Sequence, residues 1–217
     1  MVDPSAQTTH MPEAHPAPCS GCEAQRLSPL ACGSCGKLSE PETHPSPFQL
    51  FGFAPTWTVC PAELRKRLMR ITRLTHPDLH AEHDSSQAQL AEHHTAQLNE
   101  AYRLLLDDVE RTEWLIEYLG GPPASKGVPQ DLLMEVMEWN ETLDDVEHAG
   151  EAAASSALAT LDAELQTRKH QVLQGLRTLL DPLPEPNSPV LTQIREQLDV
   201  LRYLVRILER TKALQTA

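Results

Sequence analysis

Proline placement is the strongest constraint on what this 217-residue chain can fold into. Ten of its 18 prolines lie within residues 1–61. The later proline-free stretches are residues 62–76, 78–121, 130–181 and 190–217. Because proline breaks a helix interior, these stretches are where long helices can form. The chain is rich in Leu, Ala, Glu and Gln and has few β-branched runs, which favours helices over strands. We therefore predict an all-α fold.

Apolar spacing within these stretches predicts how the helices pair. Residues 62–75 repeat apolar side chains at helical spacing, and residues 85–106 do the same after a polar loop, which predicts an antiparallel hairpin. Helices over about 129–147, 151–181 and 189–213 are joined by short connections and predict a three-helix bundle. The expected core stripe of the first bundle helix is Leu132, Val136, Trp139, Leu143 and Val146.

Composition divides the chain into five segments. They are a disordered tail at 1–17, a double Cys-x-x-Cys element at 18–38, a linker at 39–47, a hairpin domain at 48–121 and the bundle at 128–217. Proline, alanine and histidine dominate the first segment, a composition typical of disorder.

The overall charge restricts the classes of partner. Lys and Arg total 18 against 31 Asp and Glu, a net charge of −13. This argues against binding to nucleic acid or to an anionic membrane. No apolar run is long enough to span a bilayer. The sequence shows no secretory or transit signal, so we expect a cytoplasmic protein, or a mitochondrial matrix protein if a transit peptide has been removed. No nucleophile–base pair or phosphate loop appears, so we expect no enzyme and no nucleotide bound by the chain itself.

Four cysteines form two Cys-x-x-Cys pairs. Cys19 and Cys22 are separated by nine intervening residues from Cys32 and Cys35. Four thiolates in this pattern suit tetrahedral Zn²⁺, and the segment is too short for a core of its own, so we predict a structural zinc site. A redox disulfide pair or a bound iron–sulfur cluster is the alternative.

A tripeptide at the end of the 62–75 helix carries the sharpest functional signal. His76, Pro77 and Asp78 follow a helix whose face opposite the core carries Lys66, Arg70 and Arg73. The aromatic-rich FQLFGF lies before this helix, and LNEAYRLL lies in the second helix. Together these features resemble the J-domain, through which J-protein co-chaperones stimulate DnaK-type ATPases. The resemblance implies that the three cations bind an acidic patch of the chaperone and that the tripeptide engages near its interdomain linker. The alternative is a solvated helix face.

The C-terminal half narrows the resemblance. DLLMEVMEWNETLDDVE at 131–147, together with FQLFGF, resembles the HscB (Jac-type) co-chaperones of iron–sulfur cluster assembly over about residues 46–213. The resemblance implies an IscU-type scaffold partner, whose cluster is then transferred. The implied scaffold-binding residues are Leu133, Met134, Met137, Glu138, Glu141 and Tyr203. The apolar ones lie off the core stripe beside acidic residues, a pattern of partner sites. Alternatively, Leu133 and Met137 widen the core.

Two other functions fit parts of the pattern. A J-protein with a different client would keep the hairpin motifs but would not bind the scaffold. A thiol redox protein or iron–sulfur-binding protein would depend on the four cysteines.

Overall fold

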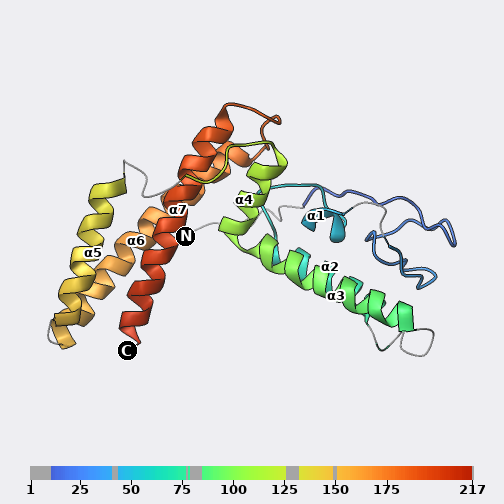
Figure 1. Cartoon of the computed structure of the whole chain (residues 1–217), viewed down its shortest axis with the longest axis horizontal. Coiled ribbons are helices and arrows are strands. Elements are labelled where there is room, and N and C mark those ends of the chain that lie inside the picture. The colour runs from blue at the N-terminus through green and yellow to red at the C-terminus, as the bar shows by residue number, and fades with distance from the viewer. Residues whose placement is uncertain are drawn as a thin grey trace, which may run out of the picture. The chain divides into compact units, whose positions relative to one another are not determined.

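A computed structural model of the chain describes residues 11–40, 44–76, 78, 85–125, 132–148 and 151–216. Its regular structure is helical (Figure 1), which confirms the all-α prediction. The helices are α1 (Pro47–Leu50), α2 (Pro61–Thr75), α3 (Ser85–Leu106), α4 (Asp108–Tyr118), α5 (Leu133–His148), α6 (Glu151–Leu180) and α7 (Val190–Gln215). Two isolated β-bridges, Glu13 with Phe53 and Ala31 with Leu38, are the extended pairings among the described residues. None of the helices described combines the length and apolarity that crossing a membrane requires.

The chain divides into two compact units, one ending at Arg111 and the other beginning at Thr112. The division falls inside α4. Residues 112–121, which the sequence analysis placed with the hairpin domain, therefore group with the C-terminal helices.

The first unit is built on the α2–α3 hairpin. Pro61 occupies the first turn of α2, where its missing N–H costs nothing. The helix ends at Thr75 because the next residue precedes a proline and adopts extended backbone, with ψ of 128° at His76. Helices α2 and α1 both pack against α3. The fully buried side chains between them include Phe48, Phe51, Phe53, Leu64, Ile71, Leu98 and Leu105.

Residues 11–17 are part of this unit, contrary to the expected disordered tail. The Met11 side chain is 1% exposed. The backbone of Ala14 donates to Gly52 O at 3.0 Å, and Ala54 N donates to Pro12 O at 2.8 Å. The buried methionine and this short backbone pairing attach to the first unit a segment whose composition predicts disorder.

The second unit is a helical bundle in which α6 packs against both α5 and α7. All five residues of the predicted α5 stripe are buried. Helices α6 and α7 approach closely at Gly175, where an added Cβ would lie 2.5 Å from Gln197 Oε1. Helices α5 and α7 run in the same direction (Figure 1). Arg210 of α7 contacts Asn140 Oδ1 at 3.0 Å and Asp144 Oδ1 at 2.7 Å on α5.

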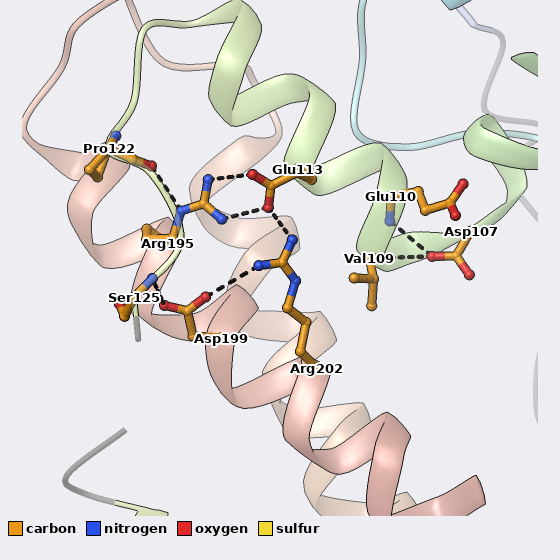
Figure 2. A network of polar contacts seen from close by, with 9 residues as sticks. All are labelled: Asp107, Val109, Glu110, Glu113, Pro122, Ser125, Arg195, Asp199 and Arg202. Atoms are coloured by element: carbon orange, nitrogen blue, oxygen red, sulfur yellow. Dashed lines mark hydrogen bonds and ion pairs between the residues drawn. The ribbon is translucent and has the colours of Figure 1, made fainter. Parts of the chain in front are cut away.

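A partly buried ionic network joins the second half of α4 to α7 within the second unit (Figure 2). Arg195, 3% exposed, forms a two-point contact with Glu113, with Nη1–Oε2 and Nη2–Oε1 distances of 2.5 and 2.7 Å. Its Nε donates to Pro122 O at 2.9 Å, and Arg202 also pairs with Glu113. Hydrogen bonding to Arg195 lowers the pKa of Glu113. Sequence spacing gave no sign of this network because its members are far apart in the chain.

Candidate metal centre and partner-binding surfaces

The four paired cysteines meet in one cluster. Their Sγ atoms all lie within 4.8 Å of one another. The Cys19–Cys35 and Cys22–Cys32 Sγ distances are 3.7 and 3.6 Å, and all four are free thiols. A tetrahedral ion with metal–sulfur bonds of about 2.3 Å places its sulfurs about 3.8 Å apart. The spacing therefore fits one metal ion held by four thiolates.

Tight turns present the sulfurs on both sides of the cluster. Gly21 N donates to Cys19 Sγ and Ser34 N donates to Cys32 Sγ, each at 3.4 Å. Gly36 N closes the second turn on Cys32 O at 3.0 Å. Gly36 has a φ of +72°, a conformation that glycine adopts without strain. These N–H groups favour negatively charged sulfur, which is the form that binds metal.

The same contacts shift the cysteine pKa values in opposite directions. Backbone N–H groups of Cys35 and Ser34 lower the pKa of Cys32 to about 6, and that of Gly21 lowers the pKa of Cys19. The N–H of Ala24 acts to lower the pKa of Cys22, but hydrogen bonding with the Cys35 and Cys32 thiols raises it to about 12. A bound cation would favour the thiolate form of all four cysteines.

The cysteine element packs against the α2–α3 hairpin. Ala31 and Leu38, which lie on either side of Cys32 and Cys35, form a buried cluster with Ala91 of α3. Leu74 of α2 and Leu90 of α3 pack against the same cluster. These helix positions are close in sequence to the two ends of the loop that begins at His76. The cysteine element therefore packs against the end of the α2–α3 hairpin that carries the connecting loop.

The loop residues that the structure describes are exposed. His76 ends α2, and its Nδ1 accepts a hydrogen bond from Asp78 N at 3.3 Å. The same nitrogen lies 3.6 Å from Asp78 Oδ2, and the two side chains are 51% and 88% exposed. Pro77 lies outside the described residues. His76 and Asp78 are thus both accessible to a partner.

The predicted basic face of α2 is also exposed. Lys66, Arg70 and Arg73 are all at the surface. None of the three forms an ion pair with a carboxylate in the part of the chain that the structure describes. Arg67 differs, because it pairs with Glu13 and its guanidinium lies 4.9 Å from the centre of the Phe53 ring. Arg67 is therefore a structural residue.

The predicted apolar residues of α5 are at the surface. Leu133, Met134 and Met137 are 46%, 68% and 60% exposed. Glu138 and Glu141 beside them are also exposed. Since the core stripe of the same helix is buried, these residues do not widen the core. They form what we call the α5 patch: Leu133, Met134, Met137, Glu138 and Glu141.

Tyr203 shares one face of α7 with Arg210, the residue that contacts α5. Arg210, which contacts α5 at Asn140 and Asp144, follows Tyr203 by seven residues, two turns of helix. Leu133 and Met137 precede Asn140 and Asp144 by the same seven residues. Helical spacing therefore puts Tyr203 on the same face of α7 as Arg210, and puts Leu133 and Met137 on the α5 face that Arg210 contacts. The Arg206 guanidinium lies over the Tyr203 ring at 5.3 Å. Sequence reasoning missed Arg210, since a lone cation carried no sign of its partners.

Two solved structures of HscB proteins share this fold. The human co-chaperone protein HscB matches with a TM-score of 0.74 at 22% identity, over 91% of this chain and 98% of the human one. Chaperone HscB from Vibrio cholerae matches with a TM-score of 0.67 at 22% identity, over 79% and 98% of the two chains. The chain therefore has the helical fold of these two HscB structures.

Sequence relatives specify the family. A family model described as the HSCB C-terminal oligomerisation domain matches residues 128–212. The co-chaperone protein HscB homolog of Pseudoalteromonas atlantica is 31% identical over 168 residues, covering 75% of this chain and 95% of the relative. That of Shewanella halifaxensis is 26% identical over 173 residues, covering 78% and 97%. The chain belongs to the HscB co-chaperone family.

Proposed function

We propose that this protein couples a DnaK/HscA-type chaperone to an IscU-type scaffold during iron–sulfur cluster transfer. The first unit stimulates the ATPase of the chaperone, and the second binds the scaffold. The observation that carries the proposal is that both predicted binding surfaces are exposed, each in a different compact unit.

The chaperone-binding surface has two parts, cations that attract the chaperone electrostatically and a loop that makes a specific contact with it. Lys66, Arg70 and Arg73 set the orientation and rate of encounter with an acidic patch. His76 supplies hydrogen-bonding capacity and Asp78 supplies a negative charge at the end of α2. Pro77 stands between them in the sequence, and a proline ring restricts the backbone angle φ. The chain itself performs no bond chemistry, and hydrolysis takes place on the chaperone.

The scaffold surface is the α5 patch with Tyr203. Methionine side chains adapt to a partner of irregular shape. The adjoining carboxylates of Glu138 and Glu141 favour a scaffold whose apolar contact is bordered by cations. Holding both partners on one chain raises their effective concentration for each other.

The metal that we propose for the cysteine cluster is zinc, in a structural role. Zinc bound there supplies the positive charge that stabilises four thiolates. Cys19, Cys22, Cys32 and Cys35 hold it, and their backbone N–H contacts orient the sulfurs. Reduced cysteines suit a cytoplasmic setting, which we propose for this function.

Steady-state ATP hydrolysis tests the chaperone half. Adding the protein to its chaperone should raise the hydrolysis rate, and adding the scaffold should raise it further. His76→Gln should abolish the stimulation without unfolding the chain, because the side chain is half exposed. Stimulation that the scaffold does not change would indicate another client. A wild-type protein that stimulates no DnaK-type chaperone would contradict the proposal.

Scaffold affinity tests the other half. Met137→Lys should raise the Kd for the scaffold by roughly tenfold, because a charge replaces an exposed apolar contact at the centre of the patch. Basal ATPase stimulation should stay at the wild-type level. Met69→Lys, at a methionine 53% exposed on α2, is the matched control and should leave scaffold affinity unchanged. Equal affinity for wild type and Met137→Lys would exclude the patch as the binding surface.

A further inference from the structure

The N-terminal element, by which we mean residues 11–40 with the cysteine element included, forms a wall along one side of α2. Met11 N donates to Glu63 Oε2 at 3.3 Å, and Glu13 pairs with Arg67 one turn further along the helix. Leu27 O lies so close to Gly52 that an added Cβ there would be 2.4 Å away. Gly52 also has a φ of +72°. Both the close approach of Leu27 O and this backbone conformation therefore favour glycine at position 52. These contacts fix the element beside the basic face of α2.

A surface groove runs between this wall and α2. The N-terminal element lines the groove with His15, Gln25 and Arg26. Helix α2 lines it with Glu63, Lys66 and Arg70. Lys66 and Arg70 are two of the three cations that we assign to chaperone binding. A partner that reaches these two cations therefore also meets the N-terminal element.

The groove carries positive charge that the protein does not neutralise. Four of its lining residues are cations and two are carboxylates: Arg26, Lys66, Arg67 and Arg70 against Glu13 and Glu63. Glu13 pairs with Arg67, and Glu63 accepts a hydrogen bond from the backbone of Met11. The guanidinium of Arg26 is held by neutral acceptors, with Nε donating to Ala17 O at 2.7 Å and Nη1 donating to Ser39 Oγ at 3.1 Å. Among the described residues, no carboxylate pairs with Arg26, Lys66 or Arg70.

The overall charge restricts what this groove accepts. A net charge of −13 repels a long polyanion such as nucleic acid. A short acidic segment on a folded protein meets only the local positive field, since charges beyond about 8–10 Å are screened at physiological salt. The groove therefore favours an acidic protein segment.

We propose that the N-terminal element forms the second wall of the chaperone-docking surface, with Arg26 adding to the charge of Lys66 and Arg70. The occupant is an acidic segment of the DnaK-type chaperone. This inference rests on the proposed function and extends its binding surface from α2 onto the cysteine element.

Charge substitutions at Gln25 test the second wall. Gln25 is exposed, lines the groove and carries no charge, so either a negative or a positive charge can be introduced there. Gln25→Glu should raise the Kd for the chaperone roughly twofold to fivefold at low salt, and Gln25→Lys should lower it by a similar factor. Both effects should shrink as salt is added. Binding is measured directly, beside the concentration that gives half-maximal ATPase stimulation.

Two further variants separate charge from structure. Gln25 Nε2 donates to Pro16 O at 3.2 Å, and Gln25→Ala removes that contact without adding charge, so it should shift Kd less than Gln25→Glu. Gln166→Glu makes the same substitution at an exposed position of α6 and should leave chaperone affinity unchanged. Metal content measured on every variant confirms that the cysteine element remains folded.

The outcomes distinguish the two proposals. Opposite shifts for Gln25→Glu and Gln25→Lys, absent at Gln166, support the second wall. Suppose that the wild-type protein stimulates the chaperone but all Gln25 variants bind it with the same Kd as wild type. The second wall would then be overturned, and the proposed function would stand. A wild-type protein that neither binds nor stimulates the chaperone would overturn both.

Discussion

Glu113 pairs with two arginines of α7 within the second unit. It faces Arg195, which is almost fully buried, and Arg202, which is partly exposed (Figure 2). Glu113→Gln leaves the buried Arg195 cation without its counter-ion. We expect it to lower the free energy of unfolding by about 3 kcal/mol at neutral pH, measured by denaturant unfolding. Because the folded-state pKa of Glu113 lies below the ordinary 4.5, its contribution is complete above that value. The contribution is lost as the pH falls through the lowered pKa, so the difference from wild type should shrink in acid.

The control for this prediction lies on the same helix as Arg195. Glu209 is exposed on α7 and forms no ion pair among the described residues, so Glu209→Gln should change stability little. If wild type and Glu113→Gln differ by the same amount at every pH, the ionised carboxylate is not the source of the stability.

At the scale of the element, the cysteine cluster and the hairpin depend on each other. Ala31 and Leu38 join the cluster to Leu74, Leu90 and Ala91. Removing the metal with a chelator should release these contacts, because the short element has little core of its own. Hydrogen exchange should then quicken at the last turn of α2 and the first turns of α3. Amides in the middle of α7 serve as the internal control. Unchanged protection around Leu74 and Ala91 after complete metal removal would refute the coupling.

Helical periodicity explains which elements were predictable. Regular apolar spacing predicted α2, α3, α5, α6 and α7, and it placed the whole α5 stripe in the core. The same spacing marked Leu133 and Met137 as lying off that stripe, and both are exposed. The packing of residues 11–17 had no such signal. It depends on single contacts, such as the burial of Met11, within a sequence that has no period.

At the scale of the molecule, local motifs could be found in the sequence, but their mutual placement could not. The Cys-x-x-Cys spacing correctly predicted that four sulfurs would meet, because the turns that form the cluster are local. The groove beside α2 depends on long-range contacts such as Glu13 with Arg67, which no spacing rule reveals. The ionic network around Arg195 has the same origin, with Glu113 lying 82 residues away.

The boundary inside α4 restricts how such a chain can change in evolution. Arg111 belongs to the first unit, where its guanidinium donates to Trp57 O and Leu105 O. Glu113 belongs to the second unit, where its carboxylate accepts from Arg195. One residue inserted between them would rotate one half of the helix by about 100° relative to the other. Either the Arg111 contacts or the Glu113 contacts would then be lost. Recombination that exchanges one unit for another therefore has to preserve helical phase, and this segment should tolerate substitutions far better than changes in length.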